Sequence, residues 1–88
     1  MDKWYLYILK CSDGSLYTGI ARDLLKRLSE HEAGKGAKYT KGRAPFELVY
    51  KEGLPDRSIA TKREIEIKSF SRNEKLELIK LYESEYGE

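Results

Sequence analysis

The chain has 88 residues, a length that fits one small domain, and we expect a single domain over residues 1–88. It contains one cysteine and one histidine, which excludes an internal disulfide and a four-ligand zinc site. Seventeen basic and fifteen acidic residues leave a net charge of +2, too small by itself to indicate a polyanionic partner. The longest apolar run, residues 4–9, is far too short to cross a bilayer, so we expect a cytoplasmic protein without membrane contact.

Residues 4–11 and 15–21 are rich in aromatic and β-branched side chains, and the turn signal Asp13-Gly14 between them predicts a β-hairpin. The length of the hairpin loop decides where Tyr7 and Tyr17 point, because a slip of one residue moves every side chain to the other face. A two-residue loop would place the two phenols on opposite faces.

A three-residue loop with Gly14 in the left-handed conformation pairs Cys11 with Ser15 and places both phenols on one face. We predict this register and assign Gly14 and Gly19 as the structural glycines of the hairpin turn. The register also gathers large apolar side chains on the opposite face: Trp4, Leu6, Ile8, Leu16 and Ile20. We therefore expect one face to form the core and the other to form the site.

Asp23 is placed to cap a helix that runs to about Glu32 and stops at Gly34. Three leucines of this helix have the spacing of a core stripe: Leu24, Leu25 and Leu28. Residues 46–52 alternate as a third strand.

Pro55-Asp56 opens a second helix through about Phe70. Ser71 and Glu74 have capping-box spacing at the start of a last helix, whose inner stripe is predicted to be Leu76, Ile79 and Tyr82. The order ββαβαα predicts the α+β class, with a small three-stranded, mainly antiparallel sheet covered by three helices. The long connection leaves open which sheet edge the third strand joins.

Arg27 and His31 stand four residues apart and share one face of the first predicted helix. A guanidinium is a planar donor suited to phosphate, and an imidazole accepts or relays a proton near neutral pH. For an arbitrary sequence a solvated helix face is the better interpretation of such a pair, by roughly three to one. The tyrosine pair moves the balance toward a site.

Glu64 falls between Ala60 and Ile67, the inward stripe predicted for the second helix, so its carboxylate lies on or beside the packed side. A carboxylate in such a position needs a partner. One candidate is a hard cation such as Mg²⁺, held together with water and phosphate oxygens. The alternative, favoured about two to one by the residues alone, is an ion pair with a basic neighbour: Arg27, Arg63 or Lys68.

Residues 33–46 contain no acidic side chain, and they carry four cations around glycines: Lys35, Lys38, Lys41 and Arg43. We expect this loop to bind the phosphate backbone of a nucleic acid without reading its sequence, although a plain basic connector fits the sequence equally well. Tyr39 in the same loop either stacks on a base or pins the loop to the domain.

Several features together resemble the GIY-YIG nuclease domain: Tyr5-Leu6-Tyr7, Tyr17-Thr18-Gly19, Arg27, His31 and Glu64. Residues 4–20 and 37–43 are similar to small stand-alone bacterial members of that superfamily, which are themselves similar to the N-terminal domain of an excision-repair nuclease. Tyr5 and Leu6 stand where the first motif usually has glycine and isoleucine. Asn73, at a predicted helix start, is a poor counterpart of the late asparagine of many nucleases.

The resemblance implies metal-dependent cleavage of DNA phosphodiester bonds, as in homing endonucleases and DNA-repair nucleases. Its implied catalytic residues are Tyr7, Tyr17, Arg27, His31 and Glu64. Glu64 would hold one Mg²⁺ or Mn²⁺, and Arg27 would neutralise charge on the phosphate. Tyr7 would be the base toward water, aided by His31, while Tyr17 orients the phosphate or the water. A phenol of pKa near 10 is ionised about one part in a thousand at pH 7, so this role needs a shift of roughly 2–4 kcal/mol.

We expect a monomer that acts on DNA, with RNA as an open alternative. Recognition should be structure-selective or nonspecific, or should depend on a protein partner. The first rival function is a nucleic-acid-binding module that keeps the fold and cuts nothing. The second is a protein-interaction domain that uses the aromatic face. Nicking of plasmid DNA that requires a divalent metal separates a nuclease from both.

Overall fold

The structure is a computed structural model that describes residues 3–86. Within this range the chain forms a three-stranded sheet, three α-helices and one 3₁₀ turn, in the order β1 (Trp4–Lys10), β2 (Leu16–Ala21), α1 (Leu24–Glu32), η1 (Lys38–Thr40), β3 (Glu47–Leu54), α2 (Arg57–Lys68) and α3 (Arg72–Tyr86). The predicted α+β class and the order ββαβαα are confirmed. The 3₁₀ turn in the basic loop is an addition to the predicted elements.

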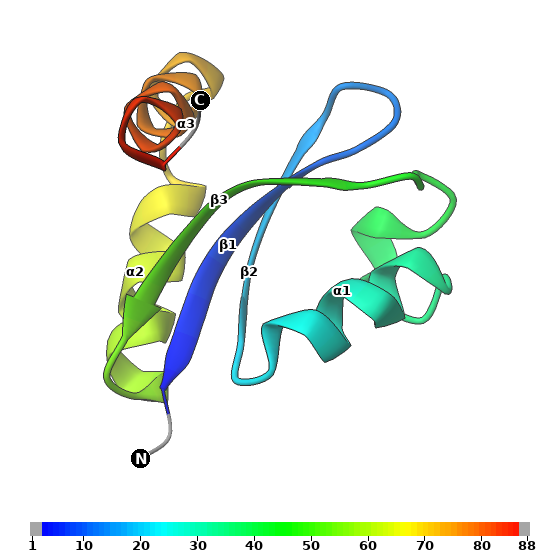
Figure 1. The fold of residues 1–88 in the computed structure, drawn as a ribbon, viewed down its shortest axis with the longest axis horizontal. Coiled ribbons are helices and arrows are strands. Elements are labelled where there is room, and N and C mark those ends of the chain that lie inside the picture. The colour runs from blue at the N-terminus through cyan, green and yellow to red at the C-terminus, as the bar shows by residue number, and fades with distance from the viewer. Residues whose placement is uncertain (1–2, 87–88) are drawn as a thin grey trace.

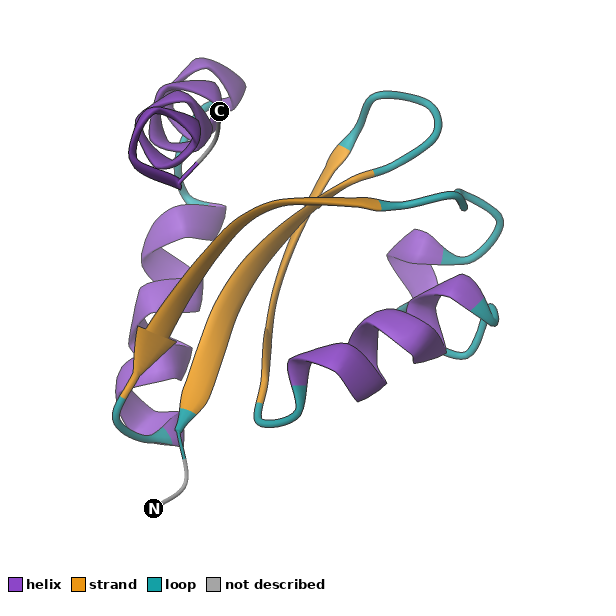
Figure 2. Ribbon diagram, in the orientation of Figure 1, coloured by secondary structure: helices purple, strands orange, loops and turns teal. Residues whose placement is uncertain are grey.

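The central strand of the sheet is β1, which pairs antiparallel with β2 on one edge and with β3 on the other. This answers the question that the sequence left open, since β3 joins the edge of β1 that β2 leaves free. Figure 1 shows α2 and α3 on one side of the sheet and α1 with the following loop on the other. Figure 2 shows the strong twist of the three strands, which brings the hairpin turn close to the loop that enters β3.

The hairpin has the predicted three-residue loop. Tyr7 pairs with Gly19, the Cys11 N–H donates to the Ser15 carbonyl at 2.8 Å, and Gly14 has a φ of +84°. The Asp13 carboxylate accepts hydrogen bonds from the Ser15 N–H and hydroxyl, which closes the turn. The assignment of Gly14 to the turn is confirmed. Gly19 lies inside β2 instead, and its role is to make room for a neighbouring side chain.

The face of the sheet covered by α2 and α3 forms the larger apolar cluster, as expected. Its buried members come from both strands and helices: Leu6, Ile8, Val49, Tyr50, Ile67 and Ile79. Leu16 and Ile20 pack against this cluster, which confirms their predicted side. Trp4 is only partly buried, and the Arg57 guanidinium lies 5.7 Å from its ring centroid.

Three expectations about the core are wrong. The tyrosine face also holds a buried cluster, formed by Tyr7, Leu9 and Ala21 with helix α1 packed on it, because the helix needs an apolar surface of its own. Leu25 is 80 % exposed, since the stripe of α1 that faces the sheet runs through Leu24 and Leu28. Leu76 is 41 % exposed, and Leu78 packs into the core beside Ile79 and Tyr82.

The predicted helix starts are confirmed by their caps. Asp23 accepts from the Lys26 N–H and Asp56 from the Ile59 N–H, which satisfies amide groups that have no partner within the helix. At the start of α3, Ser71 and Glu74 form the reciprocal pair of a capping box. Across residues 3–86, no helix has the length and the apolar character needed to cross a membrane.

Candidate active site

Tyr7 and Tyr17 lie on the same face of the hairpin, with ring centroids 6.2 Å apart. The close approach depends on Gly19, which pairs directly with Tyr7. A Cβ at Gly19 would lie 2.7 Å from the Tyr7 hydroxyl oxygen and 3.0 Å from the Tyr17 ring. Because Gly19, the glycine of the second motif, has no side chain, the Tyr7 phenol occupies the space that a Cβ would fill.

His31 reaches this pair from α1 and is almost fully buried. Its Nε2 lies 2.8 Å from the Tyr7 hydroxyl oxygen, and its ring centroid lies 5.3 Å from that of Tyr17. Its Nδ1 lies 2.8 Å from Thr40 Oγ1, and the Thr40 hydroxyl donates to the Ala37 carbonyl at 2.8 Å. These contacts link the sheet, the helix and the basic loop in one chain of hydrogen bonds.

The chain of hydrogen bonds fixes the position of each proton. A carbonyl oxygen only accepts, so the single Thr40 proton is used on Ala37 and Thr40 must accept from His31 Nδ1–H. The neutral imidazole then has no proton on Nε2, and the Tyr7 hydroxyl donates to it. His31 is thus held in the tautomer that can receive a proton from Tyr7.

Two residues of this arrangement were missed from the sequence. Thr40 fixes the tautomer of His31, and Gly36 lets the loop close over the ring, since a Cβ there would collide with His31 Nδ1. For Thr40 the available signal was the segment 37–43, to which the resemblance pointed without giving Thr40 a role, whereas Gly36 lies outside that segment.

Arg27 in α1 and Glu64 in α2 both act electrostatically on the Tyr7 phenol, whose pKa is shifted most by burial. The positive charge of Arg27 and its hydrogen bond lower the pKa of Tyr7, and the negative charge of Glu64 raises it. Arg27 is also bonded to Glu30 at 3.0 Å, and about a third of its side chain is exposed. The five residues predicted as catalytic therefore share one electrostatic neighbourhood, with Tyr7 at its centre.

Burial dominates the titration of the two central groups. It raises the pKa of Tyr7 to about 12, with the Arg27 hydrogen bond acting against it. Burial, followed by the positive charge of Arg27, lowers the pKa of His31 below its usual value of about 6.5. At pH 7 the pair is a neutral phenol that donates to a neutral imidazole.

Glu64 is the acid through which a cation would be held. Its side chain is 20 % exposed, and its carboxylate pairs with the Lys68 ammonium at 3.0 Å, the ion pair that the sequence offered as the alternative. Among residues 3–86, no three His, Cys, Asp or Glu side chains group as a metal cage. One accessible carboxylate still fits Mg²⁺ or Mn²⁺, since such ions take one or two carboxylates and fill the remaining positions with water and substrate phosphate.

The basic loop is fastened against the tyrosine pair. Tyr39 stacks on Tyr17 with centroids 5.8 Å apart, and the Arg43 guanidinium covers Tyr39 at 4.5 Å. The Tyr39 ring thus contacts both Tyr17 and Arg43 while remaining 45 % exposed, so it pins the loop, which was one of the two predicted roles. Arg43 is further bonded to Asp13 in the hairpin turn. The three lysines of the loop are exposed beside the site: Lys35, Lys38 and Lys41.

Comparison with known proteins agrees with this geometry. Residues 3–77 match the GIY-YIG catalytic domain, and the chain belongs to this family. A UPF0213 protein of Staphylococcus saprophyticus is 61 % identical over 79 residues, which cover 90 % of this chain and 96 % of that protein. A UPF0213 protein of Staphylococcus epidermidis is 57 % identical over the same shares of the two chains.

Two solved structures have the same fold. The solution NMR structure of a UPF0213 protein from Bacillus halodurans is 45 % identical, has a TM-score of 0.63 and aligns with 97 % of this chain and 90 % of its own. The solution NMR structure of a protein from E. faecalis is 38 % identical, has a TM-score of 0.65 and aligns with 93 % and 88 %. The predicted family is therefore confirmed over nearly the whole chain.

Proposed function

We propose that the protein is a metal-dependent endonuclease that cleaves DNA phosphodiester bonds. The observation that carries the proposal is the hydrogen bond from the Tyr7 hydroxyl to the unprotonated Nε2 of His31, with Arg27 and Glu64 acting on the same phenol. Membership of the GIY-YIG family supports the nuclease class. A DNA-repair role, a cytoplasmic location and a monomeric state belong to the same proposal.

Tyr7 serves best as a proton relay. With a pKa of about 12, forming its phenolate at pH 7 costs about 7 kcal/mol, at 1.36 kcal/mol per pH unit. In the relay, the attacking water gives a proton to the Tyr7 oxygen while Tyr7 gives its own proton to His31 Nε2. The water oxygen bonds to phosphorus, the bond from phosphorus to the leaving oxygen breaks, and solvent protonates that oxygen. No free phenolate forms.

The charges around the phosphate support this sequence of events. Arg27 neutralises charge on the non-bridging oxygens, and Tyr17 orients the phosphate or the water. A bound phosphate raises the proton affinity of His31, because an opposite charge nearby favours the imidazolium. Thr40 keeps the second His31 proton in place during the transfer. A Mg²⁺ or Mn²⁺ ion held by Glu64 would polarise the phosphate and stabilise the leaving oxygen.

The role of Glu64 is tested by nicking of supercoiled plasmid with Mg²⁺ or Mn²⁺. Glu64→Gln should lose at least 100-fold in rate, because the neutral amide binds a divalent cation poorly. Glu66→Gln is the matched control, since Glu66 lies two positions away in α2 and pairs with Arg63 instead. Its rate should stay within twofold of the wild type. Equal rates for the two variants, or nicking without metal, would refute the proposal.

One observation favours a binding module that does not cut: the carboxylate of Glu64 is engaged by Lys68. Such a module would retain salt-dependent binding of DNA and would give no nicking in either metal. Lys68→Ala discriminates between the two functions, because freeing Glu64 should preserve or increase cleavage by a nuclease and leave a pure binding module inactive.

A further inference from the structure

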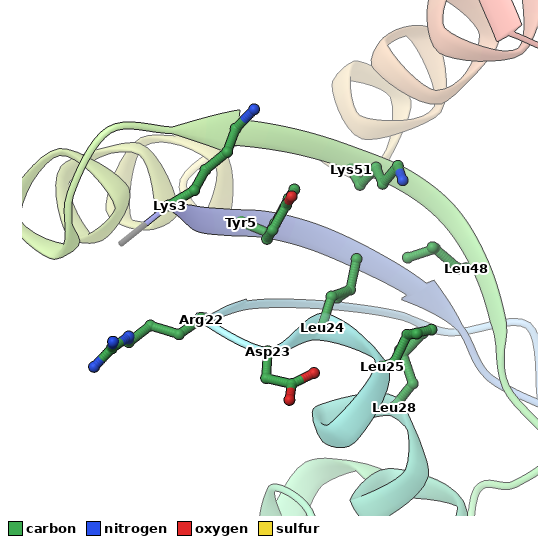
Figure 3. A pocket seen from close by; sticks show the side chains of 9 residues that line it. All are labelled: Lys3, Tyr5, Arg22, Asp23, Leu24, Leu25, Leu28, Leu48 and Lys51. Carbon is green, nitrogen blue, oxygen red and sulfur yellow. The ribbon is translucent and has the colours of Figure 1, made fainter. Parts of the chain in front are cut away.

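A hollow of about 670 Å³ opens between α1 and β3, on the face of the sheet that carries Tyr7 (Figure 3). This volume lies within the range of ligand-binding pockets. Its walls are apolar and aromatic: Tyr5, Leu24, Leu25, Leu28 and Leu48. Charged side chains complete the lining: Lys3, Arg22, Asp23 and Lys51. None of the five proposed catalytic residues is among the residues that line it.

Lys3 is positioned over the aromatic wall of the hollow. Its side chain crosses β3 at Gly53, where a Cβ would collide with Lys3 Cε, so the glycine provides the space for it. The Lys3 ammonium lies 5.8 Å from the centroid of the Tyr5 ring. Figure 3 shows Tyr5 and Lys51 on neighbouring strands above the leucines of α1, while Arg22 extends away. The hollow thus presents an aromatic ring and two ammonium groups together.

The charge of the hollow favours an anionic occupant. The lining residues include three basic side chains and one acidic side chain, Asp23. The Asp23 carboxylate accepts a hydrogen bond from the Lys26 N–H as the cap of α1. Leu25 stands 80 % exposed among the lining residues, so a flat apolar group entering the hollow would cover it. A group with a flat aromatic face and an attached negative charge matches this surface, and a nucleotide with an unpaired base has both.

The hollow lies on the opposite flank of α1 from Arg27. By the helical period of 100° per residue, Leu25 and Arg27 stand on either side of the sheet-facing direction of Leu24. A helix is about 10–12 Å across with its side chains, which is about three nucleotides at 3.4 Å per step. A strand that passes from the site around α1 to the hollow must therefore be at least this long.

We propose that this hollow binds an unpaired nucleotide of a single-stranded segment, with the base against Tyr5 and the leucines and the phosphate at Lys3 and Lys51. The inference rests on the proposed function and narrows its substrate to nucleic acid with an unpaired strand close to the scissile bond, such as a flap or a branch. A continuous duplex keeps its bases stacked and offers no base face to the hollow.

The experiment is an NMR titration of the ¹⁵N- and methyl-labelled protein in EDTA with a 12-nucleotide oligothymidylate, and in parallel with a 12-base-pair blunt duplex. The oligothymidylate should shift the signals of Tyr5, Leu25 and Lys51, and the duplex should leave them in place. Shifts confined to the basic loop, or equal shifts with the duplex, would overturn the inference. So would equal shifts with an acidic peptide such as oligoglutamate.

Two exposed positions test the hollow without disturbing the fold. Leu25→Glu and Lys51→Glu should each weaken oligothymidylate binding at least fivefold, while controls of equal charge change on α3, Leu81→Glu and Lys80→Glu, stay within twofold. Equal loss in the controls would overturn the inference. Because EDTA prevents metal-dependent cleavage, the two proposals fail separately. Shifts at the hollow without plasmid nicking would refute only the nuclease, and nicking without these shifts would refute only the hollow.

Discussion

Thr40 has no acidic or basic function, yet it decides which proton His31 carries. Its hydroxyl donates to Ala37 and therefore accepts from Nδ1, which leaves Nε2 free for Tyr7. Such supporting hydrogen bonds orient a histidine and set its basicity. At metal-binding histidines their loss commonly lowers metal affinity or activity by about 10–100-fold. The chemistry proposed for Tyr7 thus depends on a residue of the basic loop.

Thr40→Val keeps the shape of the side chain and removes the hydroxyl. We expect His31 to populate both neutral tautomers and the cleavage rate to fall by about 10–100-fold, while Thr40→Ser restores both properties. The ¹⁵N chemical shifts of the His31 ring, measured beside single-turnover cleavage, report the tautomer directly. A valine variant with a single Nδ1–H tautomer and an unchanged rate would rule out this role.

His31 also links stability to pH. Its pKa is lower in the folded chain than the usual value of about 6.5, so the unfolded chain binds more protons in acid. The stability from neutral His31 is therefore fully present above pH 6.5 and is lost as the pH falls through the folded-state pKa. The Arg27 guanidinium that acts on the ring stays charged and the Tyr7 phenol that donates to it stays neutral between pH 5.5 and 7.5.

We expect the free energy of unfolding to decrease from pH 7.5 to 5.5, with a slope of at most about 1.4 kcal/mol per pH unit for one proton. His31 is the one histidine of the chain, so His31→Asn should flatten the slope in this window. Urea denaturation at four pH values measures it. The prediction is wrong if the asparagine variant keeps the wild-type slope.

At the scale of elements, the loop 33–46 acts as a cover that carries charge. Tyr39 stacks on Tyr17, the Ser12 N–H donates to the Arg43 carbonyl, and Thr40 holds His31. Arg43 and Tyr39 were both predicted to bind nucleic acid. In the structure their side chains contact each other, Tyr17 and Asp13, and these contacts hold the loop in place. The remaining cations of the loop are therefore the ones expected to contact phosphate: Lys35, Lys38 and Lys41.

Replacing these three lysines with glutamine should lower the slope of log K against log salt by about 2–3, since each phosphate contact contributes about 0.7–0.9. A matched triple variant on the helices, at the exposed residues Lys26, Lys62 and Lys80, should keep the wild-type slope. Fluorescence anisotropy with labelled DNA from 50 to 300 mM salt gives both values. Equal slopes for the two variants would mean that the loop is only a connector.

The elements were predictable because local rules and packing agree on them. The register of the hairpin follows from Gly14 and from the apolar side chains that must share a face with Leu6, and the caps at Asp23 and Asp56 are local signals. The position of β3 was not predictable, because its pairing with β1 depends on a 14-residue connection whose path the loop contacts decide.

The site was predictable only where the residues lie in regular elements. His31 and Arg27 share a helix face, and the hairpin register brings Tyr7 beside Tyr17. The link from His31 to Thr40 joins residues nine positions apart, across the end of α1 and the irregular loop before η1, and no periodic pattern describes that loop. The prediction that Leu25 belongs to the core was wrong, because a helix of nine residues has one narrow inward stripe and a leucine next to Leu24 falls outside it.

At the scale of the whole molecule, a thin sheet is covered on both faces, and each covering layer contributes to the site. Helix α1 brings Arg27 and His31 over one face, and α2 brings Glu64 from the layer that covers the other (Figure 1). The buried phenol of Tyr7 lies where these contributions meet. In the mechanism proposed above, Tyr7 relays a proton in this position and does more than pack as a buried aromatic ring.

The proton relay is tested by single-turnover cleavage of a branched DNA with Mg²⁺, in which Tyr7→Phe is compared with Tyr50→Phe. Tyr50 is an equally suitable reference because it is also buried, has a pKa raised to about 12 by burial and donates to Glu52. The relay predicts a loss of about 10²–10⁴-fold for Tyr7→Phe with DNA affinity unchanged, and a rate within threefold of wild type for Tyr50→Phe. Equal cleavage rates for the two folded variants would contradict it.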